Sequence, residues 1–323
     1  MSFANNSSGV YETPKWTYVS IVSLIITILS GVFNFLVLAL VIRKKRLRTS
    51  FNIYIISLLT ANMMFTVIGN TLDVYNDLWS SWGLGFHVCT LYMYAIWTLT
   101  SCQIFMHFVI STNRFCAAAF PIKYRHKHTY LMAIYLSLGA WIAAHLITLP
   151  GIIIDAEKYR KRDVSKGCHI DVTINSGQQH WMICVQLSSC VVIACIMLMY
   201  SFIMYAQKLH RQKVFPKNRA ASIPNEAFTS GATATKTLRA HAATLLTVIT
   251  ASLVVFWSPA TLYYVIVPLT DGIWDTNIVA VTNMMFNFQT VMDPIIMALA
   301  VSDIRQHIWK VVHRFTKATG NTE

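Results

Sequence analysis

Two charged side chains stand in stretches of the chain that otherwise carry no charge. Asp293 is the single Asp, Glu, Lys or Arg between Thr276 and Ser302, and Arg114 ends an uncharged stretch that begins at Leu78. A carboxylate within a long apolar segment is costly to keep there, so it indicates a functional site. Neither a nucleophile–base set nor a Cys–His cluster with zinc spacing accompanies these residues. The chemistry they indicate is charge recognition or switching, and we expect no enzyme activity, metal or cofactor.

The apolar segments around these residues are long enough to cross a membrane. The chain has 323 residues, of which 55% are hydrophobic and 12% are charged, about half the charge of soluble domains. Each charge-poor interval exceeds the roughly 20 residues that a spanning helix needs. A spanning segment must satisfy its backbone internally, which predicts helices, and a large soluble helical protein would rarely show so many. The intervals are 16–42, 49–72, 78–113, 128–154, 172–207, 240–270 and 276–302.

The net charge of +13 is unevenly placed. If all seven intervals span, the N-terminus and the even-numbered loops carry six of the Lys and Arg residues, whereas the odd-numbered loops and the C-terminus carry the other twenty. Positive loops stay in the cytoplasm, which predicts an extracellular N-terminus and a cytoplasmic C-terminus at the plasma membrane. The excess positive charge then reflects topology and attraction to anionic membrane lipid, and nucleic acid is not an expected partner.

Several residues fall on the side that this topology places outside. Asn5 and Asn6 each begin a glycosylation sequon in the polar N-terminus. Cys89 stands at the outer start of the third span and Cys168 in the second outer loop. Both face an oxidising compartment, where disulfides form and persist, so we predict a bond between them. The remaining five cysteines fall in or beside predicted helices and are expected to pack as small apolar residues.

The chain divides into four predicted regions. They are an extracellular N-terminus (1–17), an all-α seven-transmembrane helix bundle (18–300), a short amphipathic helix on the inner membrane surface (301–315) and a cytoplasmic tail (316–323). In the bundle, we expect spans at about 18–43, 51–76, 86–117, 129–152, 179–208, 236–268 and 275–300. The absence of a long internal repeat argues against a transporter built on inverted repeats.

Six of the predicted spans and one inner loop carry a characteristic residue or short motif. In chain order these are Asn34 in "SGVFNFLVL", Asn62 ending "ISLLTAN", Cys89, Arg114 in "NRF", Pro121 in "AAAFPIKY", Trp141, "FWSP" with Trp257 and Pro259, and "MDPIIM" with Asp293 and Pro294. Over nearly the whole chain this order resembles the rhodopsin-like (class A) G-protein-coupled receptor family. The resemblance implies a seven-helix receptor that passes an extracellular signal to a heterotrimeric G protein.

The resemblance also assigns roles to individual residues. It implies that the inner half of the sixth helix swings outward on activation, and the missing N–H of Pro259 provides a bend for this movement. Trp257 is a candidate switch, with core packing as its alternative role. The coupling residues implied are Arg114, Asn113, Pro121, Tyr200 and Arg239. Those of the switch and polar core are Asn34, Asn62, Trp257, Pro259, Asp293 and Pro294. Arrestin is a further candidate partner, which the short tail supports less well.

The chain departs from the family pattern at Asn62 and Asp293. The family usually has Asp in the second helix and Asn in the seventh, and here the two are exchanged. We expect a hydrogen bond between them, which Asn34 could join. Family members often hold sodium at the second-helix acid, so the exchange puts sodium binding in question. The fifth helix also lacks a proline, and Met297 replaces the family's seventh-helix tyrosine, which leaves Tyr200 without its usual partner.

Alignment with the family predicts a ligand pocket in the outer half of the bundle. Its lining would comprise Asp73, Tyr75, Met93, Ile96, Trp97, Thr100, Cys184, Ser188, Trp257, Thr261, Tyr264, Asn283 and Asn287. Aminergic relatives have an Asp at the position of Ile96, which argues against a simple monoamine in the usual pose. Retinal-binding relatives have a lysine at the position of Asn287, which argues against covalent retinal. Asp73 could still bind a cation, or could be a solvated carboxylate at the interface.

The second outer loop, "IDAEKYRKRDVSKGCHID", holds five basic residues on the side where the topology rule disfavours them. An acidic or peptidic ligand is therefore the first expectation, since this charge would attract it, although the loop could simply be solvated. A small polar molecule or a lipid is the alternative ligand. An atypical receptor that does not couple is a further alternative, because Asn113, Asn62 and Met297 alter family motifs.

Arg114 has no acidic neighbour in the sequence. The family has an acid at the position of Asn113, and often another at the base of the sixth helix, where this chain has Arg239. An arginine that reaches to lipid headgroups is the simpler interpretation. The order of the motifs favours a G-protein contact, and the missing acids predict a weakly held resting state with raised basal activity.

Overall fold

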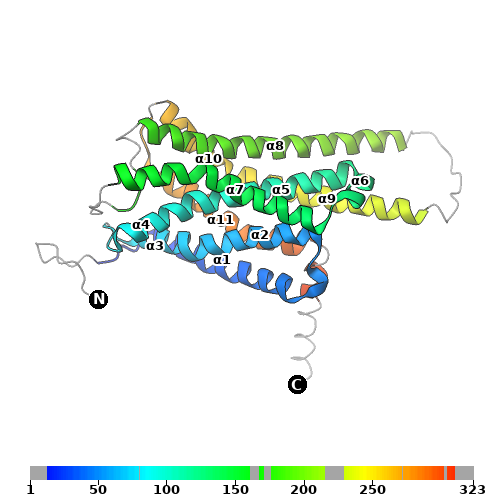
Figure 1. Ribbon diagram of the computed structural model, residues 1–323, viewed down its shortest axis with the longest axis horizontal. Coiled ribbons are helices and arrows are strands. Elements are labelled where there is room, and N and C mark those ends of the chain that lie inside the picture. The colour runs from blue at the N-terminus through cyan, green and yellow to red at the C-terminus, as the bar shows by residue number, and fades with distance from the viewer. Residues whose placement is uncertain are drawn as a thin grey trace, which may run out of the picture.

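The computed structural model describes residues 13–79, 81–160, 167–170, 176–214, 229–270, 272–301 and 304–309. Seven helical segments run side by side along the long axis of the molecule (Figure 1). No strand occurs among the described residues, which confirms the predicted all-α bundle. In order, the segments are α1 (Tyr18–Arg43); α2, η2 and α3 (Ser50–Met64, Phe65–Asn70, Thr71–Leu78); α4, η3 and α5 (Gly85–Tyr94, Ala95–Leu99, Thr100–Ala119); α7 and η4 (Tyr130–Ile154, Asp155–Tyr159); α8 (Ser176–Val214); α9 and α10 (Thr229–Phe256, Ser258–Leu269); and α11 (Thr276–Ala300).

Polar residues at the membrane boundary determine where several helices begin. The side chains of Thr17, Thr49 and Thr129 accept the backbone N–H three residues on, at the starts of α1, α2 and α7. Asp275 caps α11 in the same way. Such caps satisfy donors that the first helical turn leaves free. At the opposite end of the bundle from Tyr18, the short helices η1 (Lys45–Leu47) and α6 (Pro121–Lys127) lie in the first two loops that the predicted topology places inside.

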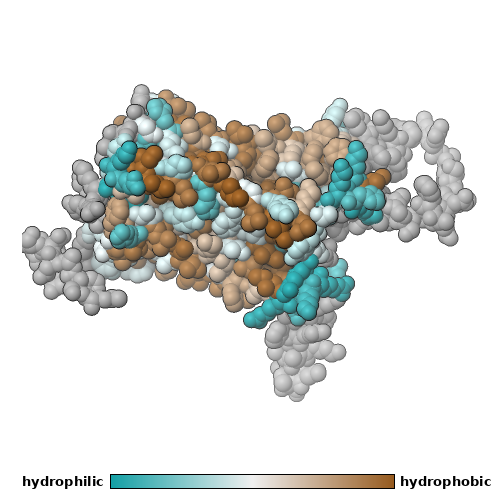
Figure 2. Space-filling view, in the orientation of Figure 1, coloured by the Kyte–Doolittle hydropathy of each residue, from teal (hydrophilic) through white to brown (hydrophobic). Residues whose placement is uncertain are grey.

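The outward faces of the helices are apolar. Large hydrophobic side chains are exposed along α1 and α7, among them Ile28, Phe35, Leu138 and Leu146. In Figure 2, brown atoms cover much of the middle of the visible face and teal atoms gather toward its ends. Five described helices are long and apolar enough to span a membrane, and α9 with α10 makes a sixth span bent by 41°. The chain is thus a multi-pass membrane protein, because so large an apolar surface requires lipid.

The seventh segment, α11, is less apolar because it turns polar residues inward. Its buried side chains include Thr282, Asn287, Gln289, Thr290 and Asp293. These face the centre of the bundle, where α5 contacts α2, α7, α8 and α9. The central position of α5 places Arg114 and the residues two turns before it among most of the other spans.

Irregular turns interrupt three of the spans. The second, third and fourth contain single π turns, η2, η3 and η4, and the first two of these contact each other. A π turn adds one residue and so rotates the segment beyond it by about 100°. The sixth span bends between Phe256 and Ser258, because Pro259 cannot donate to the carbonyl four residues earlier.

The predicted amphipathic helix is described only over residues 304–309, which are helical. Ile304 is buried and Ile308 packs against the core, whereas Arg305 is exposed. The rest of this predicted helix lies outside the described residues. So do the predicted tail and the sequons at Asn5 and Asn6.

Candidate functional site

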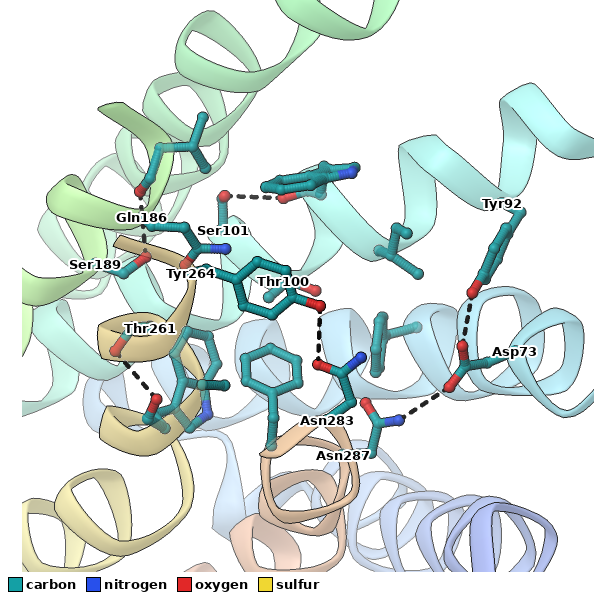
Figure 3. Close-up of a pocket in the computed structure, with 17 residues that line it drawn as sticks. Asp73, Tyr92, Thr100, Ser101, Gln186, Ser189, Thr261, Tyr264, Asn283 and Asn287 are labelled. Carbon is teal, nitrogen blue, oxygen red and sulfur yellow. Dashed lines mark hydrogen bonds between the residues drawn. The ribbon is translucent and has the colours of Figure 1, made fainter. Parts of the chain in front are cut away.

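A cavity opens between six spans, the first, second, third, fifth, sixth and seventh, in the halves that the predicted topology places outside (Figure 3). Its deep part, of about 120 Å³, reaches Trp257 and Phe286, and its wider outer part, of about 580 Å³, reaches Cys168 and Trp274. We call both parts together the outer cavity. The residues that line both parts are Asp73, Tyr92, Ile96, Trp97, Tyr264, Asn283 and Asn287.

Most of the predicted pocket residues lie in this lining. Besides Asp73, Ile96, Trp97, Tyr264, Asn283 and Asn287, the lining includes the predicted Met93, Thr100, Thr261 and Trp257. Sequence reasoning missed Tyr92, whose hydroxyl points at Asp73 in Figure 3, and Asp77 one turn beyond Asp73. The spacing of Asp73 and Asp77, four residues apart on a helix, was the signal that could have identified the second acid.

The prediction for the fifth span is wrong by one position. Cys184 is exposed on α8, and the hydroxyl of Ser188 donates to the carbonyl of Val185; neither lines the outer cavity. Val185 and Ser189 line it instead. The described helix α8 contains no proline and no irregular turn, so it keeps a regular register that an alignment to proline-containing relatives does not reproduce.

Tyr75 is also absent from the lining. Its ring centroid lies 6.1 Å from that of Trp79 and 5.5 Å from that of Trp82, in an aromatic cluster beside the cavity. The extra residue in η2 rotates α3 relative to a regular helix. The rotated segment presents Asp73 and Asp77 to the outer cavity and Tyr75 to the aromatic cluster.

Asp73 and Asp77 place two carboxyl groups in the outer cavity. Asp73 accepts the hydroxyl of Tyr92 at 2.6 Å and the amide of Asn287 at 3.2 Å, and Asp77 accepts the hydroxyl of Ser23 at 3.3 Å. These donors are neutral, and the described residues that line the cavity include no Lys or Arg and a single His, His169. A carboxylate held away from water without a counter-charge is costly, so the cavity suits a cationic group.

A third carboxylate lies deeper in the bundle and is fully enclosed. Asp293 is 1% exposed, and its Oδ2 accepts the amide of Asn62 at 2.9 Å. Nε2 of His107 lies 3.2 Å from the same oxygen, and the amide of Gln289 donates to Oδ1 at 2.6 Å. The expected bond between Asn62 and Asp293 is therefore present. We call Asn62, His107, Gln289 and Asp293 the polar core.

Asn34 does not join this group. Its amide donates to the backbone carbonyls of Ser30 and Thr290, both at 2.8 Å. It thereby ties α1 to α11 through the backbone, and not through the exchanged pair Asn62 and Asp293. The side chain of Asn34 has a structural position beside the polar core.

His107 and Gln289 were missed because only Asp, Glu, Lys and Arg were counted in the spans. His107 is 1% exposed in a stretch without other ionisable charge, two helical turns before Arg114 on the same face of α5. Gln289 precedes Asp293 by one turn, at the spacing at which helical side chains meet. A buried histidine and a buried acid within bonding distance form a pair that both helices α5 and α11 must position.

Trp257 stands between the outer cavity and the polar core. Its indole lines the deep part of the cavity and packs against Phe286, with ring centroids 4.5 Å apart. On its other side, its ring centroid lies 6.5 Å from that of His107, at an interplanar angle of 72°. A ligand that displaced Trp257 would therefore disturb the ring that contacts Asp293.

A family model for the seven-transmembrane receptors of the rhodopsin family matches residues 33–297. The chain belongs to this family. The histamine H1 receptor of Rattus norvegicus is 26% identical over 161 residues, which is 46% of this chain and 33% of that receptor. The octopamine receptor beta-2R of Chilo suppressalis is 25% identical over 317 residues, 88% of this chain and 76% of that receptor. The long-wave-sensitive opsin 1 of Felis catus is 27% identical over 212 residues, 61% of this chain and 57% of that opsin. The match to the histamine receptor thus spans about a third of its length.

In this rhodopsin-family receptor, Arg114 has no acidic partner among the described residues. Its Nη2 donates to Oδ1 of Asn113 at 3.2 Å, and its guanidinium lies 3.2 Å from the ring centroid of Phe51. The hydroxyl of Tyr124 donates to the same Asn113 oxygen at 3.0 Å. Burial lowers the pKa of the neighbouring His128 imidazole, and the Arg114 charge lowers it further.

The other predicted coupling residues lie near this end of the bundle. Pro121 begins α6, where its missing N–H is tolerated, and is buried. Tyr200 is partly buried against the main core cluster. Arg239 is on α9, but its side chain lies outside the described residues.

The predicted disulfide is present between Cys89 and Cys168. It fixes the second outer loop to the third span beside the outer cavity, of which Cys168 forms a wall. In the same loop, Arg160 forms an ion pair with Asp155 and donates to the hydroxyl of Thr90 at 2.8 Å. Arg160 therefore uses its charge within the protein, whereas Lys158, the other described basic residue of this loop, is exposed.

Proposed function

We propose that this receptor recognises a ligand through a cationic group, which binds at Asp73 in the outer cavity. The observation that carries the proposal is the cavity's charge: Asp73 and Asp77 have only neutral hydrogen-bond donors, and no described Lys or Arg lines the walls. An ammonium or guanidinium group would supply the missing charge and a charge-assisted hydrogen bond. Trp97 offers an aromatic face for the same cation.

The names of two relatives support this ligand class. Histamine and octopamine both carry an amine, and receptors named for them match this chain. The match is limited, because Ile96 stands where aminergic relatives have an acid. In this receptor the recognising carboxylate comes from the second span instead of the third, and the ligand would lie across the cavity toward α3 and α11.

An acidic or peptidic ligand, expected first from the basic outer loop, has less support. Of the five basic residues, Arg160 is paired with Asp155 and Lys158 is exposed on η4, outside the cavity lining; Lys161, Arg162 and Lys166 lie outside the described residues. The cavity would repel a carboxylate at Asp73 and Asp77. A peptide with a basic side chain or a free amino terminus would still satisfy the site, whereas a neutral lipid would not.

Binding would reach the G protein through the sixth span. A ligand on Asp73 and Trp97 would contact Trp257, which precedes the bend at Pro259. Outward movement of the inner half of α9 would then open the end of the bundle at Arg114 to a heterotrimeric G protein. We place the N-terminus outside the plasma membrane and the C-terminus in the cytoplasm, as the loop charges predict.

The ligand proposal is tested with a G-protein dissociation sensor in cells that express the receptor. A panel of small amines is compared with their neutral N-acetyl derivatives and with carboxylate ligands of similar size. We expect only amines to activate, and Asp73→Asn to weaken the active amine roughly tenfold or more, since a hydrogen bond to a charged group contributes about 1.5–3 kcal/mol.

Glu157→Gln is the matched control, because Glu157 is an exposed acid in the outer part of the fourth span and lies outside the cavity lining. It should leave the amine response unchanged at equal surface expression. An active carboxylate ligand, or an amine whose potency is unchanged by Asp73→Asn, would contradict the proposed ligand class.

A further inference from the structure

A second cavity lies near the end of the bundle that is predicted to be cytoplasmic, on the surface that faces away from the bundle centre. It measures about 440 Å³ and is bounded by α5, α6 and α7. Its walls are nearly all apolar, with Phe108 and Val109 on α5 facing Met132 and Leu136 on α7. Met132 and Leu136 are 44% and 41% exposed, so the cavity opens toward the space that lipid fills around a spanning bundle. We call this cavity the inner groove.

Two lysines stand at the end of the inner groove where the spans leave the membrane. Lys123 and Lys127 both line it, and both are exposed on α6. They are four residues apart, so their side chains lie on the same face of that helix. In the orientation shared by Figures 1 and 2, teal atoms gather where α6 lies.

The described residues provide no acidic partner for these lysines. No Asp or Glu occurs between Asp77 and Asp155, an interval that contains all of α4, α5, α6 and α7. Neither lysine forms an ion pair among the described residues. No described acid thus supplies their counter-charge, and basic residues next to a spanning helix attract anionic lipid headgroups.

We propose that the inner groove binds one anionic phospholipid of the membrane leaflet on this side. Its phosphate and headgroup would lie between Lys123 and Lys127, and one acyl chain would pack in the groove against Val109 and Leu136. A phospholipid matches both parts of the site. Its anionic headgroup can pair with the two lysines, and its attached hydrocarbon chain can pack against the apolar walls. A free phosphate would leave the groove empty, and a neutral lipid would leave the lysines unpaired.

The position of the groove gives the bound lipid a contact with the coupling end of the receptor. Asn113 and Tyr124 both line it, and the hydroxyl of Tyr124 donates to the Asn113 oxygen that also accepts Arg114. The lipid would therefore lie against Asn113, which accepts from Arg114, and against Tyr124, which donates to Asn113.

The binding is tested on the purified full-length receptor by native mass spectrometry from mixed micelles with equal parts phosphatidylserine and phosphatidylcholine. We expect phosphatidylserine to be retained preferentially, and Lys123→Gln/Lys127→Gln to reduce that preference roughly tenfold or more. Lys44→Gln/Lys45→Gln removes the same charge from exposed residues in the first inner loop, outside the groove, and should leave the preference unchanged.

A second pair of variants tests the acyl chain. Leu136→Trp would fill the groove and displace the lipid while both lysines remain, whereas Ile142→Trp, on the exposed face of α7 outside the groove, should not. Both sites are exposed, so thermal unfolding should be unaffected. Three results would overturn the proposal. The receptor could retain the two lipids equally, or Lys44→Gln/Lys45→Gln could reduce the preference as much as the groove variant does. Soluble glycerophosphoserine, added at the concentration of the lipid, could also compete with phosphatidylserine for binding. None of these results depends on the receptor's own ligand.

Discussion

The receptor holds acidic side chains in two contrasting regions of the same bundle. In the polar core, the two oxygens of Asp293 accept or lie beside donors from Asn62, His107 and Gln289, on the second, third and seventh spans. In the outer cavity, Asp77 has one neutral donor and Asp73 has two, and both line open space. A carboxylate surrounded by the protein's own donors stabilises the bundle, whereas one that faces a cavity is available to a ligand.

The largest effect should come from Asp293→Ala. This change removes the shared partner of Asn62, His107 and Gln289 in a site that is 1% exposed, and each buried polar group left without its partner costs about 1–3 kcal/mol. We expect poor surface expression and a markedly lower thermal unfolding temperature of the purified receptor. Asp293→Asn with Asn62→Asp, which restores the family arrangement, is the control and should recover much of the loss. An Asp293→Ala receptor with normal expression and normal signalling would show that the polar core does not hold the bundle together.

His107→Leu should separate the histidine's role from that of the acid. Leucine fills a similar volume but removes one of the three polar partners of Asp293, while Asn62 and Gln289 still donate to its two oxygens. A single hydrogen bond contributes about 0.5–1.5 kcal/mol. We expect a smaller drop in unfolding temperature than for Asp293→Ala. Gln103→Leu, one turn earlier and also buried on α5 but without a bond to Asp293, is the matched control. Equal effects of the two leucines would mean that polarity on α5, and not the pair with Asp293, is what matters.

For Asp73 and Asp77, we expect substitution to impair the ligand response and not the stability of the bundle, the reverse of the main effect expected at Asp293. Asp73→Asn should impair the response to a cationic ligand while leaving the unfolding temperature unchanged or higher, because it removes an uncompensated charge. Asp77→Asn should do the same with a smaller loss of response, since Asp77 lines only the outer part of the cavity. Unfolding scans with and without the amine measure both effects. A strong destabilisation by Asp73→Asn would place this acid in the same structural class as Asp293.

Charge and motif order were sufficient to predict the bundle, the disulfide and the bond between Asn62 and Asp293. Long uncharged intervals determine spanning helices wherever the backbone must be satisfied internally. The register of individual side chains was not predictable in the same way. Cys184 and Ser188 were misplaced because a regular α8 shifts the inward face by one residue, and Tyr75 because η2 rotates α3. His107 was not predicted as a partner of Asp293, although Asp293 itself was recognised as a functional residue. The two residues are 186 positions apart in the sequence, and only the folded bundle brings them together.

The smallest effect is expected at Arg114, a cation that resembles Asp73 and Asp77 in having no partner of opposite charge among the described residues. Its contacts are the Asn113 oxygen and the face of Phe51. We propose that this weak hold leaves the resting state easily disturbed and basal activity raised. Asn113→Asp would add an acid beside the guanidinium, and an ion pair of about 1 kcal/mol lowers the active population several-fold. Basal nucleotide exchange on a purified G protein, at matched receptor amounts, measures the change without any ligand.

Tyr124→Phe, which removes the second donor to Asn113 and adds no charge, is the control and should not lower basal exchange. Unchanged basal exchange in Asn113→Asp would mean that Asn113 and Phe51 already hold Arg114 as firmly as an acid does.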